Sequence, residues 1–452
     1  MTYQQGDTIV AIATPPGEGG VGILRLSGSQ ALAIATVLCG GAKKVKALMP
    51  RHAHFRRFHA RDSSVIDHGI ALYFPAPHSY TGETVVELQG HGSPLALASL
   101  LTEAIALGAR PARAGEFSER AFLNGRLDLA QAEAVADLIH ARSDAQARAA
   151  AASLEGAFSQ AVDGIHGQLL QLLAFAEAGL DFSEEDLGDA HELAIADGLM
   201  RLEGQIAHLL KQAQQGARLA RGGRVVLAGR PNVGKSSLMN ALARRASAIV
   251  TAIPGTTRDL LREEIVLDGL PVELIDTAGL RAATDAVEAE GIARARNILH
   301  SAQLILLVVD ASTGWQAEDE AILRDLPEGP RLILWNKLDL VSAPPLVPVG
   351  EQGIALSAQT GAGLDTLRRS LMEALGVQGD SCPFSARRRH VETLEHCLQD
   401  IHAARDMHRL GDSPELVAQS LREAAVALAS ITGHIDVEDI LGEIFSHFCI
   451  GK

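Results

Sequence analysis

The chain contains few cysteines and few aromatic residues. Its four cysteines, Cys39, Cys382, Cys397 and Cys449, form no Cys-x-x-Cys pair, so neither a zinc site nor a disulfide scaffold is expected. Aromatic residues make up 4% of the chain, which argues against the base-stacking surfaces that bind single-stranded nucleic acid.

Long hydrophobic runs and an amino-terminal signal segment are also lacking. The longest apolar strings, such as LILLVV, are far too short to cross a bilayer. The start, MTYQQGDTIV, has no basic region followed by an apolar run. These absences predict a soluble protein of a reducing compartment, the cytoplasm, with no membrane partner.

Positive charge is in deficit. The net charge of -15 argues against a protein that coats nucleic acid non-specifically. Residues 43–61 are a local exception, because they hold seven Lys or Arg residues and no acid. This basic stretch is either a solvated loop or strand edge, or a local phosphate contact, and the sequence leaves both open.

The 452 residues exceed one ordinary hydrophobic core, so several domains are expected. The pattern predicts an α+β domain over residues 1–120, with TIVAIATP, VGILRLSG, GIALYF and TVVELQG as strands. Residues 121–216 and 381–452 are rich in Ala, Leu, Gln and Glu at helical spacing and predict a helical domain. The acidic stretch at 181–189 is expected to be a loop between helices.

Residues 217–380 alternate short β-rich runs with helical stretches, the signature of a doubly wound α/β sheet. Asp268 and Gly269 are expected to join two of the runs as a tight hairpin. Because helical chain lies on both sides, this block is predicted to be an insertion. The expected fold class is therefore multidomain, α/β plus all-α, with an N-terminal α+β domain.

One phosphate-binding motif lies in this inserted block. GRPNVGKS, at 229–236, fits Gly-x-x-x-x-Gly-Lys-Ser and follows a predicted strand. Its glycines let backbone N–H groups wrap phosphates, Lys235 reaches the β- and γ-phosphates, and the Ser236 hydroxyl ligates Mg²⁺. The pattern alone also occurs by chance, so the neighbouring motifs decide.

Four further motifs follow in order at predicted strand ends. TAIPGTTRD offers Thr257 as a second magnesium ligand, and DTAG offers Asp276 for the magnesium shell and the Gly279 N–H for the γ-phosphate. In NKLD, the Asp339 carboxylate can accept both guanine N–H donors, which adenine does not offer, and Ser357 and Ala358 support the base. Together they predict a GTPase domain of the Ras-like P-loop type. The residues expected to contact GTP are Asn232, Val233, Gly234, Lys235, Ser236, Ser237, Thr251, Ala252, Ile253, Pro254, Gly255, Thr256, Thr257, Asp276, Thr277, Ala278, Gly279, Asn336, Lys337, Asp339, Ser357 and Ala358.

The hydrolytic machinery departs from that of Ras-like enzymes. Their water-positioning glutamine follows DxxG, where this chain has Leu280, which cannot orient water. Candidates for the missing function are an acid in residues 284–291, such as Glu288, or a cation beside the phosphates near Asn232. Glu288 as a solvated helix acid and Asn232 as a loop capper remain the alternatives.

Over its whole length the chain resembles the MnmE (TrmE) family of bacterial GTPases that install the 5-carboxymethylaminomethyl group on tRNA uridine. The resemblance rests on ATPPGEGGVGILRLSG, on PARAGEFSERAFLNGRLDLAQAEAVADLI, on the inserted GTPase motifs and on the terminal CIGK. It implies a homodimer that acts on tRNA with a flavoprotein, MnmG (GidA), in a heterotetramer or larger assembly. Together the two proteins would add an aminomethyl-type group to carbon 5 of the wobble uridine.

The resemblance also implies that the one-carbon unit comes from a tetrahydrofolate derivative, of the 5-formyl or methylene type, bound to the N-terminal, dimerising domain. By residue match the folate contacts would be Arg25, Glu87, Arg126 and Lys452. Relative to a family member with Lys at this position, Arg126 keeps the charge but changes the geometry. Without the resemblance, Arg25 and Glu87 are equally well explained as an ion pair at strand edges.

For hydrolysis, the resemblance implies a potassium ion in place of an arginine finger. The ion would be held by Asn232, Thr251, Ile253 and Thr256, with Glu288 as the catalytic acid. Facing GTPase domains of the homodimer would order these loops.

The last four residues, Cys449 to Lys452, would lie by the folate site. Cys449 is a candidate nucleophile, since a thiolate adds to electrophilic carbon and a nearby Lys lowers the pKa of a thiol. Its alternative is a small buried packing residue. A rival function, a GTP-switched ribosome-assembly factor without chemistry of its own, would be expected to carry a basic RNA-binding appendage, whereas the flanks here are helical and acidic.

Overall fold

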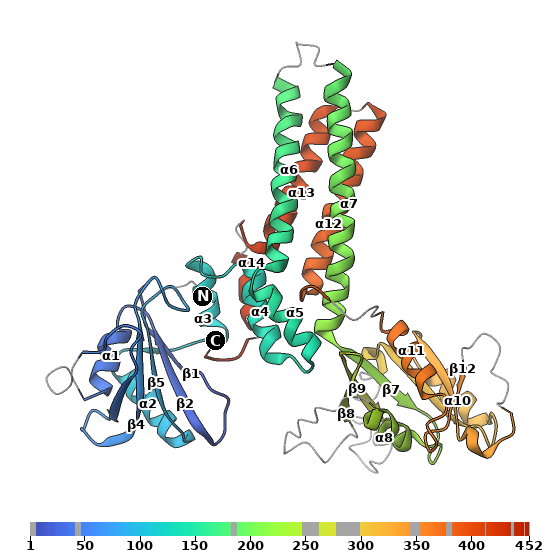
Figure 1. Cartoon of the computed structure of the whole chain (residues 1–452), viewed down its shortest axis with the longest axis horizontal. Helices are drawn as coiled ribbons and strands as arrows, with labels where there is room; N and C mark the ends of the chain where they lie inside the picture. The colour runs from blue at the N-terminus through green and yellow to red at the C-terminus, as the bar shows by residue number, and fades with distance from the viewer. Residues whose placement is uncertain are drawn as a thin grey trace. The chain divides into compact units, whose positions relative to one another are not determined.

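The computed structural model describes residues 6–40, 47–181, 188–245, 262–276, 299–343, 353–376, 382–411, 413–434, 438–446 and 448–451. These residues form two compact units (Figure 1). The first unit comprises Met1–Ala136 with Ala425–Lys452, and the second comprises Asp137–Ala424. Among the described residues, no helix is both long enough and apolar enough to span a membrane.

A six-stranded sheet forms the centre of the first unit, in the order β3-β4-β5-β2-β1-β6. Its strands are β1 (Ile9–Ile12), β2 (Gly19–Ser27), β3 (His54–His59), β4 (Val65–Phe74), β5 (Val85–Gly92) and β6 (Arg110–Pro111). The four strands expected here are present. Part of the basic stretch forms β3, which lies at the edge of the sheet and pairs with β4.

Different helices pack on the two faces of this sheet. Helices α1 (Ala31–Leu38) and α2 (Pro94–Ala106) pack on one face, where Leu24, Leu26 and Leu88 belong to the core. On the other face, Ile9 and Ala11 of β1 contact Phe117 of α3 (Glu116–Leu123). Because side chains alternate along a strand, Arg25 and Glu87 lie on the α3 face.

The C-terminal part of the first unit returns to α3. Helix α14 (Glu438–Ser446) packs on α4 (Leu129–His140) and contacts α3, through a core that includes Leu129, Phe445 and Phe448. Helix α13 (Pro414–Thr432) begins at Pro414 and ends before Gly433. Gly433 adopts a left-handed φ of +82°, which explains the stop.

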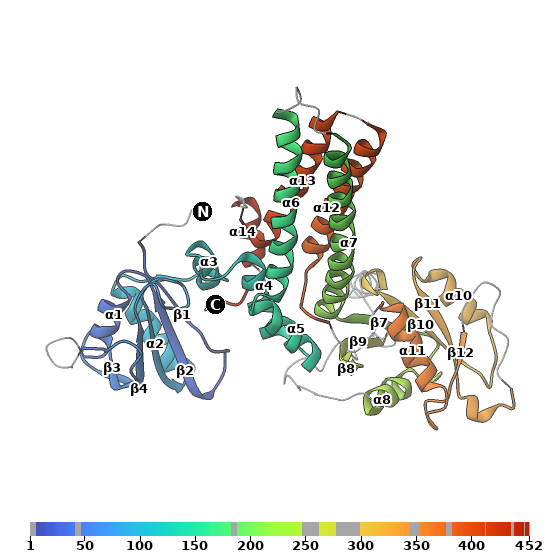
Figure 2. The same cartoon turned by 45° about the horizontal axis from the view of Figure 1, so that its top comes forward.

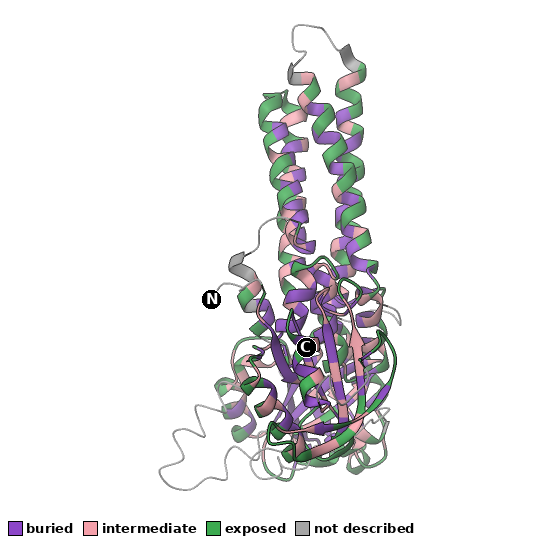
Figure 3. Cartoon of the chain, turned by 90° about the vertical axis from the view of Figure 1, so that its left-hand side faces the viewer, coloured by how far each residue is buried: buried purple, intermediate pink, exposed green. Residues whose placement is uncertain are grey.

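Long helices form one part of the second unit. They are α5 (Asp144–Leu154), α6 (Ala157–Asp181), α7 (Gly188–Arg221) and α12 (Arg388–Leu410). Helix α7 packs against α6 and α12, and the buried residues run along these helices as interrupted stripes (Figure 3). The helices reach Asp181 and resume at Gly188, so the predicted acidic loop falls mostly outside the described residues.

The other part of the second unit is a doubly wound sheet in the order β12-β11-β10-β7-β9-β8 (Figure 2). Its strands are β7 (Gly223–Ala228), β8 (Arg262–Leu267), β9 (Leu270–Asp276), β10 (Leu304–Asp310), β11 (Arg331–Asn336) and β12 (Gly353–Ala355). All neighbours are parallel except β8 and β9, which form the predicted hairpin, with φ of +49° at Asp268 and +85° at Gly269.

Helices cover both faces of this sheet. Helices α8 (Lys235–Arg245) and α11 (Leu364–Ala374) contribute to the core on one face, and α10 (Ala317–Asp325) contributes Ile322 on the other. A 3₁₀ turn, η2 (Leu338–Leu340), follows β11. The predicted fold class, α/β with an inserted doubly wound domain plus helices, is confirmed.

Candidate functional site

The loop between β7 and α8 has the geometry of a phosphate-binding loop. Gly229 and Gly234 adopt φ of +141° and +96°, and a Cβ there would lie 2.4 Å from the Val308 carbonyl oxygen and 2.3 Å from Asn336 Nδ2 respectively. Only glycine fits both the backbone conformation and the space. The loop therefore passes under β10 and β11 and delivers its N–H groups to the start of α8.

Lys235 opens α8 and is almost fully buried. Its Nζ donates to the carbonyl oxygens of Gly229 at 3.0 Å and Arg230 at 2.9 Å. These contacts hold the ammonium group across the loop, where it can meet the terminal phosphates of a nucleotide.

Ser236 and Asp276 bring two oxygen ligands together at the carboxyl end of the sheet. The Ser236 hydroxyl donates to Asp276 Oδ2 at 3.5 Å, and Asp276 is fully buried at the end of β9. Hydroxyl and carboxylate oxygens are the ligands that Mg²⁺ prefers, so the pair fits that ion. Thr257, the second predicted magnesium ligand, lies outside the described residues.

Asn336 joins the phosphate-binding loop to the predicted guanine site. Its Nδ2 donates to the Val233 carbonyl oxygen at 2.8 Å, and its Oδ1 accepts from the Ala358 N–H at 3.0 Å. In the same corner the Ser357 hydroxyl donates to Asp339 Oδ1. The structure thus brings the NKLD motif, Ser357 and Ala358 together, with a carboxylate available for the base.

Asp310 is a residue of this site that the sequence analysis missed. It ends β10, and its Oδ2 accepts from Lys337 Nζ at 2.6 Å. Burial acts to raise the pKa of Asp310, but hydrogen bonds from Lys337 and Ser312 outweigh it and hold the pKa below its usual value. The ionised carboxylate orients Lys337 beside the base site. Its position as the first polar residue after LILLVV was the available signal.

Several predicted site residues have no described structure. They are Thr251, Ala252, Ile253, Pro254, Gly255, Thr256, Thr257, Thr277, Ala278, Gly279, Glu288 and Lys452. Asn232 and Ser237 are described. Asn232 lies exposed in the loop with a left-handed φ of +63°.

A second polar site lies on the α3 face of the first unit. Arg25 Nε donates to Glu87 Oε1 at 3.0 Å, and its guanidinium lies 5.5 Å from the ring centroid of Tyr80 and 5.7 Å from that of Phe117. Tyr80 in turn is hydrogen-bonded through its hydroxyl to Ser118 Oγ at 2.8 Å. An ion pair is therefore held between two aromatic rings and remains partly exposed.

The C-terminal segment reaches this second site. Ile450 forms a bridge with Ala114, and Arg25 Nη1 donates to the Gly451 carbonyl oxygen at 3.2 Å. Cys449 is exposed, which contradicts its alternative reading as a buried packing residue. Arg126 lies exposed just after α3. Its side chain lies close to Gly82, because a Cβ added to that glycine would be 3.3 Å from Arg126 Cγ.

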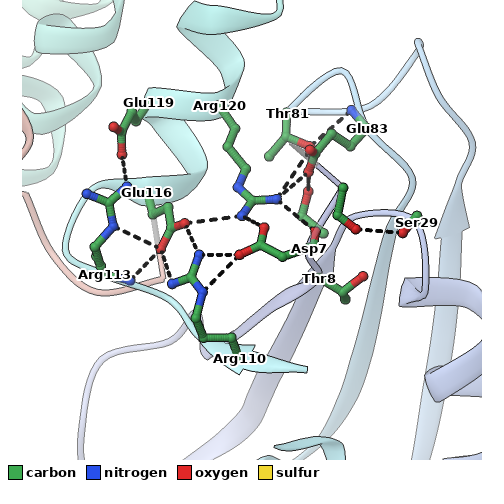
Figure 4. A network of polar contacts seen from close by, with 12 residues as sticks. Asp7, Thr8, Ser29, Thr81, Glu83, Arg110, Arg113, Glu116, Glu119 and Arg120 are labelled. Carbon is green, nitrogen blue, oxygen red and sulfur yellow. Dashed lines mark hydrogen bonds and ion pairs between the residues drawn. The ribbon is translucent and has the colours of Figure 1, made fainter. Parts of the chain in front are cut away.

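A network of charges holds α3 in place (Figure 4). Arg120 is fully buried and donates to Glu83 at 3.0 Å and to Glu116 at 3.1 Å, while Arg110 donates to Glu116 at 2.6 Å and to Asp7 at 2.7 Å. Burial acts to raise the pKa of Glu116, but the hydrogen bonds from Arg110 and its neighbours lower it to about 2. The network ties α3, and with it Phe117, to β6 and to the segments that directly precede β1 and β5.

Three features together define a P-loop GTPase. They are the doubly wound sheet, the phosphate loop that requires glycine, and the predicted guanine site around Asn336 and Asp339.

Two family models match the chain, "GTP-binding protein TrmE N-terminus" over residues 8–126 and "MnmE helical domain" over residues 129–449. The tRNA modification GTPase MnmE of Laribacter hongkongensis is 51% identical over 453 residues, 99% of each chain. That of Nitrosococcus oceani is 49% identical over 458 residues, 100% of this chain and 98% of the relative.

The chain belongs to the MnmE family of tRNA modification GTPases. Among solved structures, the G domain of the Thermotoga maritima FeoB iron transporter is 27% identical and covers 34% of this chain and 98% of that chain, with a TM-score of 0.27.

Proposed function

We propose that this GTPase hydrolyses GTP in a potassium-dependent manner and, with a flavoprotein partner of the MnmG type, adds an aminomethyl-type group to carbon 5 of the wobble uridine in tRNA. The one-carbon unit comes from a tetrahydrofolate derivative. The single observation that carries the proposal is a GTP site and a separate Arg25–Glu87 site in one chain of the MnmE family. Because tRNA and GTP are cytoplasmic, the protein acts in the cytoplasm.

We assign the work to three domains, with boundaries from the sequence pattern. Residues 1–120 bind folate and dimerise, residues 121–216 with 381–452 form the helical domain, and residues 217–380 form the GTPase domain. The GTP-contacting residues are those predicted above. We infer that Lys235 meets the phosphates, that Ser236 and Asp276 hold Mg²⁺, and that Asp339 selects guanine. The contacts of Lys235 with the loop carbonyl groups, of Ser236 with Asp276 and of Ser357 with Asp339 support these roles.

The proposed potassium dependence is supported by Leu280, which stands where Ras-like enzymes carry the water-positioning glutamine, and by Asn232 in the phosphate loop. The Asn232 side chain offers an amide oxygen, a fitting potassium ligand, from an exposed place in the phosphate loop. Thr251, Ile253 and Thr256 would complete the ligands, and Glu288 would act on the attacking water. We expect fast hydrolysis in potassium and slow hydrolysis in sodium, and equal rates in the two salts would reject this part.

The second site fits a folate. Folates carry a flat ring with hydrogen-bonding edges and a carboxylate tail, and Tyr80 and Phe117 supply aromatic faces beside the charged Arg25 and Glu87. When bound, the folate supplies the one-carbon unit. Arg25 and Glu87 hold it by charge-assisted hydrogen bonds, and Arg126 and Lys452 add cations.

Cys449 is the proposed nucleophile of the modification reaction. It is exposed in a segment whose neighbours contact the second site, so a substrate can reach the thiol. Cys449→Ser should abolish wobble-uridine modification while GTP hydrolysis and folate binding stay close to normal, because Ser keeps the size but not the thiolate. If the variant still supports normal wobble-uridine modification, the nucleophile must belong to the partner protein.

A homodimer is supported by the open part of the first sheet. Phe55 and Ile70 lie side by side in one row of the α3 face, and Gln89 separates them from Ile23 in the same row. Phe55 is 67% exposed and Ile70 is 38% exposed. Apolar side chains in such a row favour a protein partner over water. Phe55→Glu should shift the mass measured by light scattering toward the monomer.

The function is tested most directly by mass analysis of tRNA nucleosides from a strain that lacks this chain. We expect loss of the wobble-uridine modification and its return when the chain is supplied. Equal levels of the modified nucleoside with and without the chain would leave the rival ribosome-assembly role, which no described feature of the first unit favours.

A further inference from the structure

Arg25 contacts more than its ion-pair partner. Its Nε is held by Glu87 and its Nη1 by the Gly451 carbonyl oxygen, and two aromatic rings lie beside the guanidinium. Gln89 Nε2 donates to the other carboxylate oxygen of Glu87 at 3.1 Å. One side chain therefore links the proposed folate site to the backbone of the C-terminal segment, two residues after Cys449.

Two glycines receive this segment. Gly451 is buried with φ of +98°, and a Cβ there would lie 2.4 Å from the Ile12 carbonyl oxygen. Gly115 precedes α3 with φ of +66°, its N–H donates to the Cys449 carbonyl oxygen at 3.4 Å, and a Cβ would lie 2.7 Å from the Phe445 carbonyl oxygen. The segment is seated by close backbone contacts that any larger residue would disturb.

We propose that Arg25 is a positioning residue that couples occupancy of the one-carbon site to the placement of Cys449. The inference rests on the proposed folate function. Arg25 presents one rigid fork to three groups, the Glu87 carboxylate, the Gly451 carbonyl and the ligand. Binding of the ligand stabilises the arginine in the conformation that also holds the segment, and the seated segment presents Arg25 to the ligand. Coupling of this kind is reciprocal and is typically worth about fivefold or more in affinity.

The experiment measures alkylation of Cys449 in the full-length protein by iodoacetamide, with the C-terminal peptide quantified by mass spectrometry. The other cysteines provide internal references, since Cys39 and Cys397 are buried and burial raises their pKa to about 11 and about 12. We expect saturating 5-formyltetrahydrofolate to slow alkylation of Cys449 about fivefold or more.

Variants separate coupling from binding. Arg25→Lys keeps the charge and the pairing with Glu87 but has a single nitrogen, so the segment loses its anchor. Alkylation should then be faster without ligand, and ligand at a concentration saturating for the variant should no longer slow it. Arg113→Lys is the matched control, because the Arg113 guanidinium pairs with Glu119 and Glu116 beside the same turn and, within the described part of the chain, not with Gly451.

Two more variants test the reciprocity. Gly451→Ala should speed alkylation without ligand and weaken ligand binding by a similar factor. Lys452→Ala should weaken binding but keep protection of Cys449 at saturation.

The outcomes distinguish this inference from the proposed function. If the ligand binds the wild-type protein and leaves the alkylation rate unchanged, the coupling is wrong while folate binding stands. If no ligand binds, the folate function is wrong. The rate of Cys449 alkylation in ligand-free Arg25→Lys then tests only whether Arg25 anchors the C-terminal segment. A rate equal to that of the wild-type protein would show that it does not.

Discussion

Replacing Asn336 by alanine should damage both the stability of the GTPase region and its affinity for GTP. The Asn336 side chain is almost fully buried, and its amide joins the phosphate loop at Val233 to the base-binding loop at Ala358. Alanine removes both hydrogen bonds. The Val233 carbonyl and the Ala358 N–H are then left without this partner in a site too tight for easy rearrangement.

The magnitude follows from the number of groups involved. Each net hydrogen bond between neutral groups contributes about 0.5–1.5 kcal/mol, and each buried partner left unsatisfied costs about 1–3 kcal/mol. Partial entry of water reduces the sum, so we expect a loss of about 2–4 kcal/mol in the free energy of unfolding. Because the two nucleotide-binding loops lose their link, the affinity for GTP should fall at least roughly tenfold, or about 1.4 kcal/mol.

The assay uses the chain's two tryptophans. Trp315 and Trp335 both lie in the GTPase region, with ring centroids 6.1 Å apart, and Trp335 directly precedes Asn336. Urea unfolding followed by tryptophan fluorescence therefore reports on this region in the full-length protein. Asn240→Ala, at an exposed position of α8, is the control and should change stability by less than about 0.5 kcal/mol. An unfolding free energy of Asn336→Ala equal to that of the control would refute the reasoning.

Three further predictions concern base choice, acid stability and the hairpin. Asp339→Asn should lower the preference for GTP over ATP at least roughly tenfold, because a charge-assisted hydrogen bond contributes about 1.5–3 kcal/mol, and competition binding would show it. The pKa of Glu116 is lowered from 4.5 to about 2, so its stabilisation is complete above pH 4.5 and is lost as the pH falls toward 2. Glu116→Gln should therefore be less stable than wild type at pH 7, with a difference that shrinks in acid, as hydrogen exchange of α3 would measure; a constant difference would contradict the assignment. Gly269→Ala should cost about 1 kcal/mol or more, since φ there is +85° and the Ala145 Cβ lies 3.0 Å from the new atom, and unchanged urea unfolding would contradict it.

The sequence predicted those features that depend on nearby residues. Ser followed by Pro favours the start of a helix, and helix α2 begins at Pro94 with the Ser93 side chain accepting from the Ala96 N–H. The β8–β9 hairpin turns at Asp268 and Gly269, the two residues whose left-handed φ such a turn requires. In both cases the interacting groups are two to four residues apart, so the pattern contains the whole interaction.

The basic stretch shows where local pattern was insufficient. HFRRFH, which forms β3, has no strong strand signal, and it becomes an edge strand because β4 offers a pairing partner. In this strand His54 and Phe58 are buried and Phe55 is exposed. This difference arises because one face of the strand packs against a core, and the local sequence does not show which face that is.

By itself, the sequence determined the GTPase motifs, their order and the insertion of a doubly wound sheet, because each motif is continuous and its chemistry resides in adjacent residues. Tertiary structure alone decided that Asp310 holds Lys337, that Arg120 is buried among three carboxylates, and that Arg25 holds the Gly451 carbonyl. Apart from Glu116, which stands four residues before Arg120, these partners are far apart along the chain, and side-chain type does not say which of the many charged residues will meet. The pairing of β10 with β11 brings Lys337 to Asp310, and the packing of α3 and the C-terminal segment onto the first sheet brings Arg120 and Arg25 to their partners.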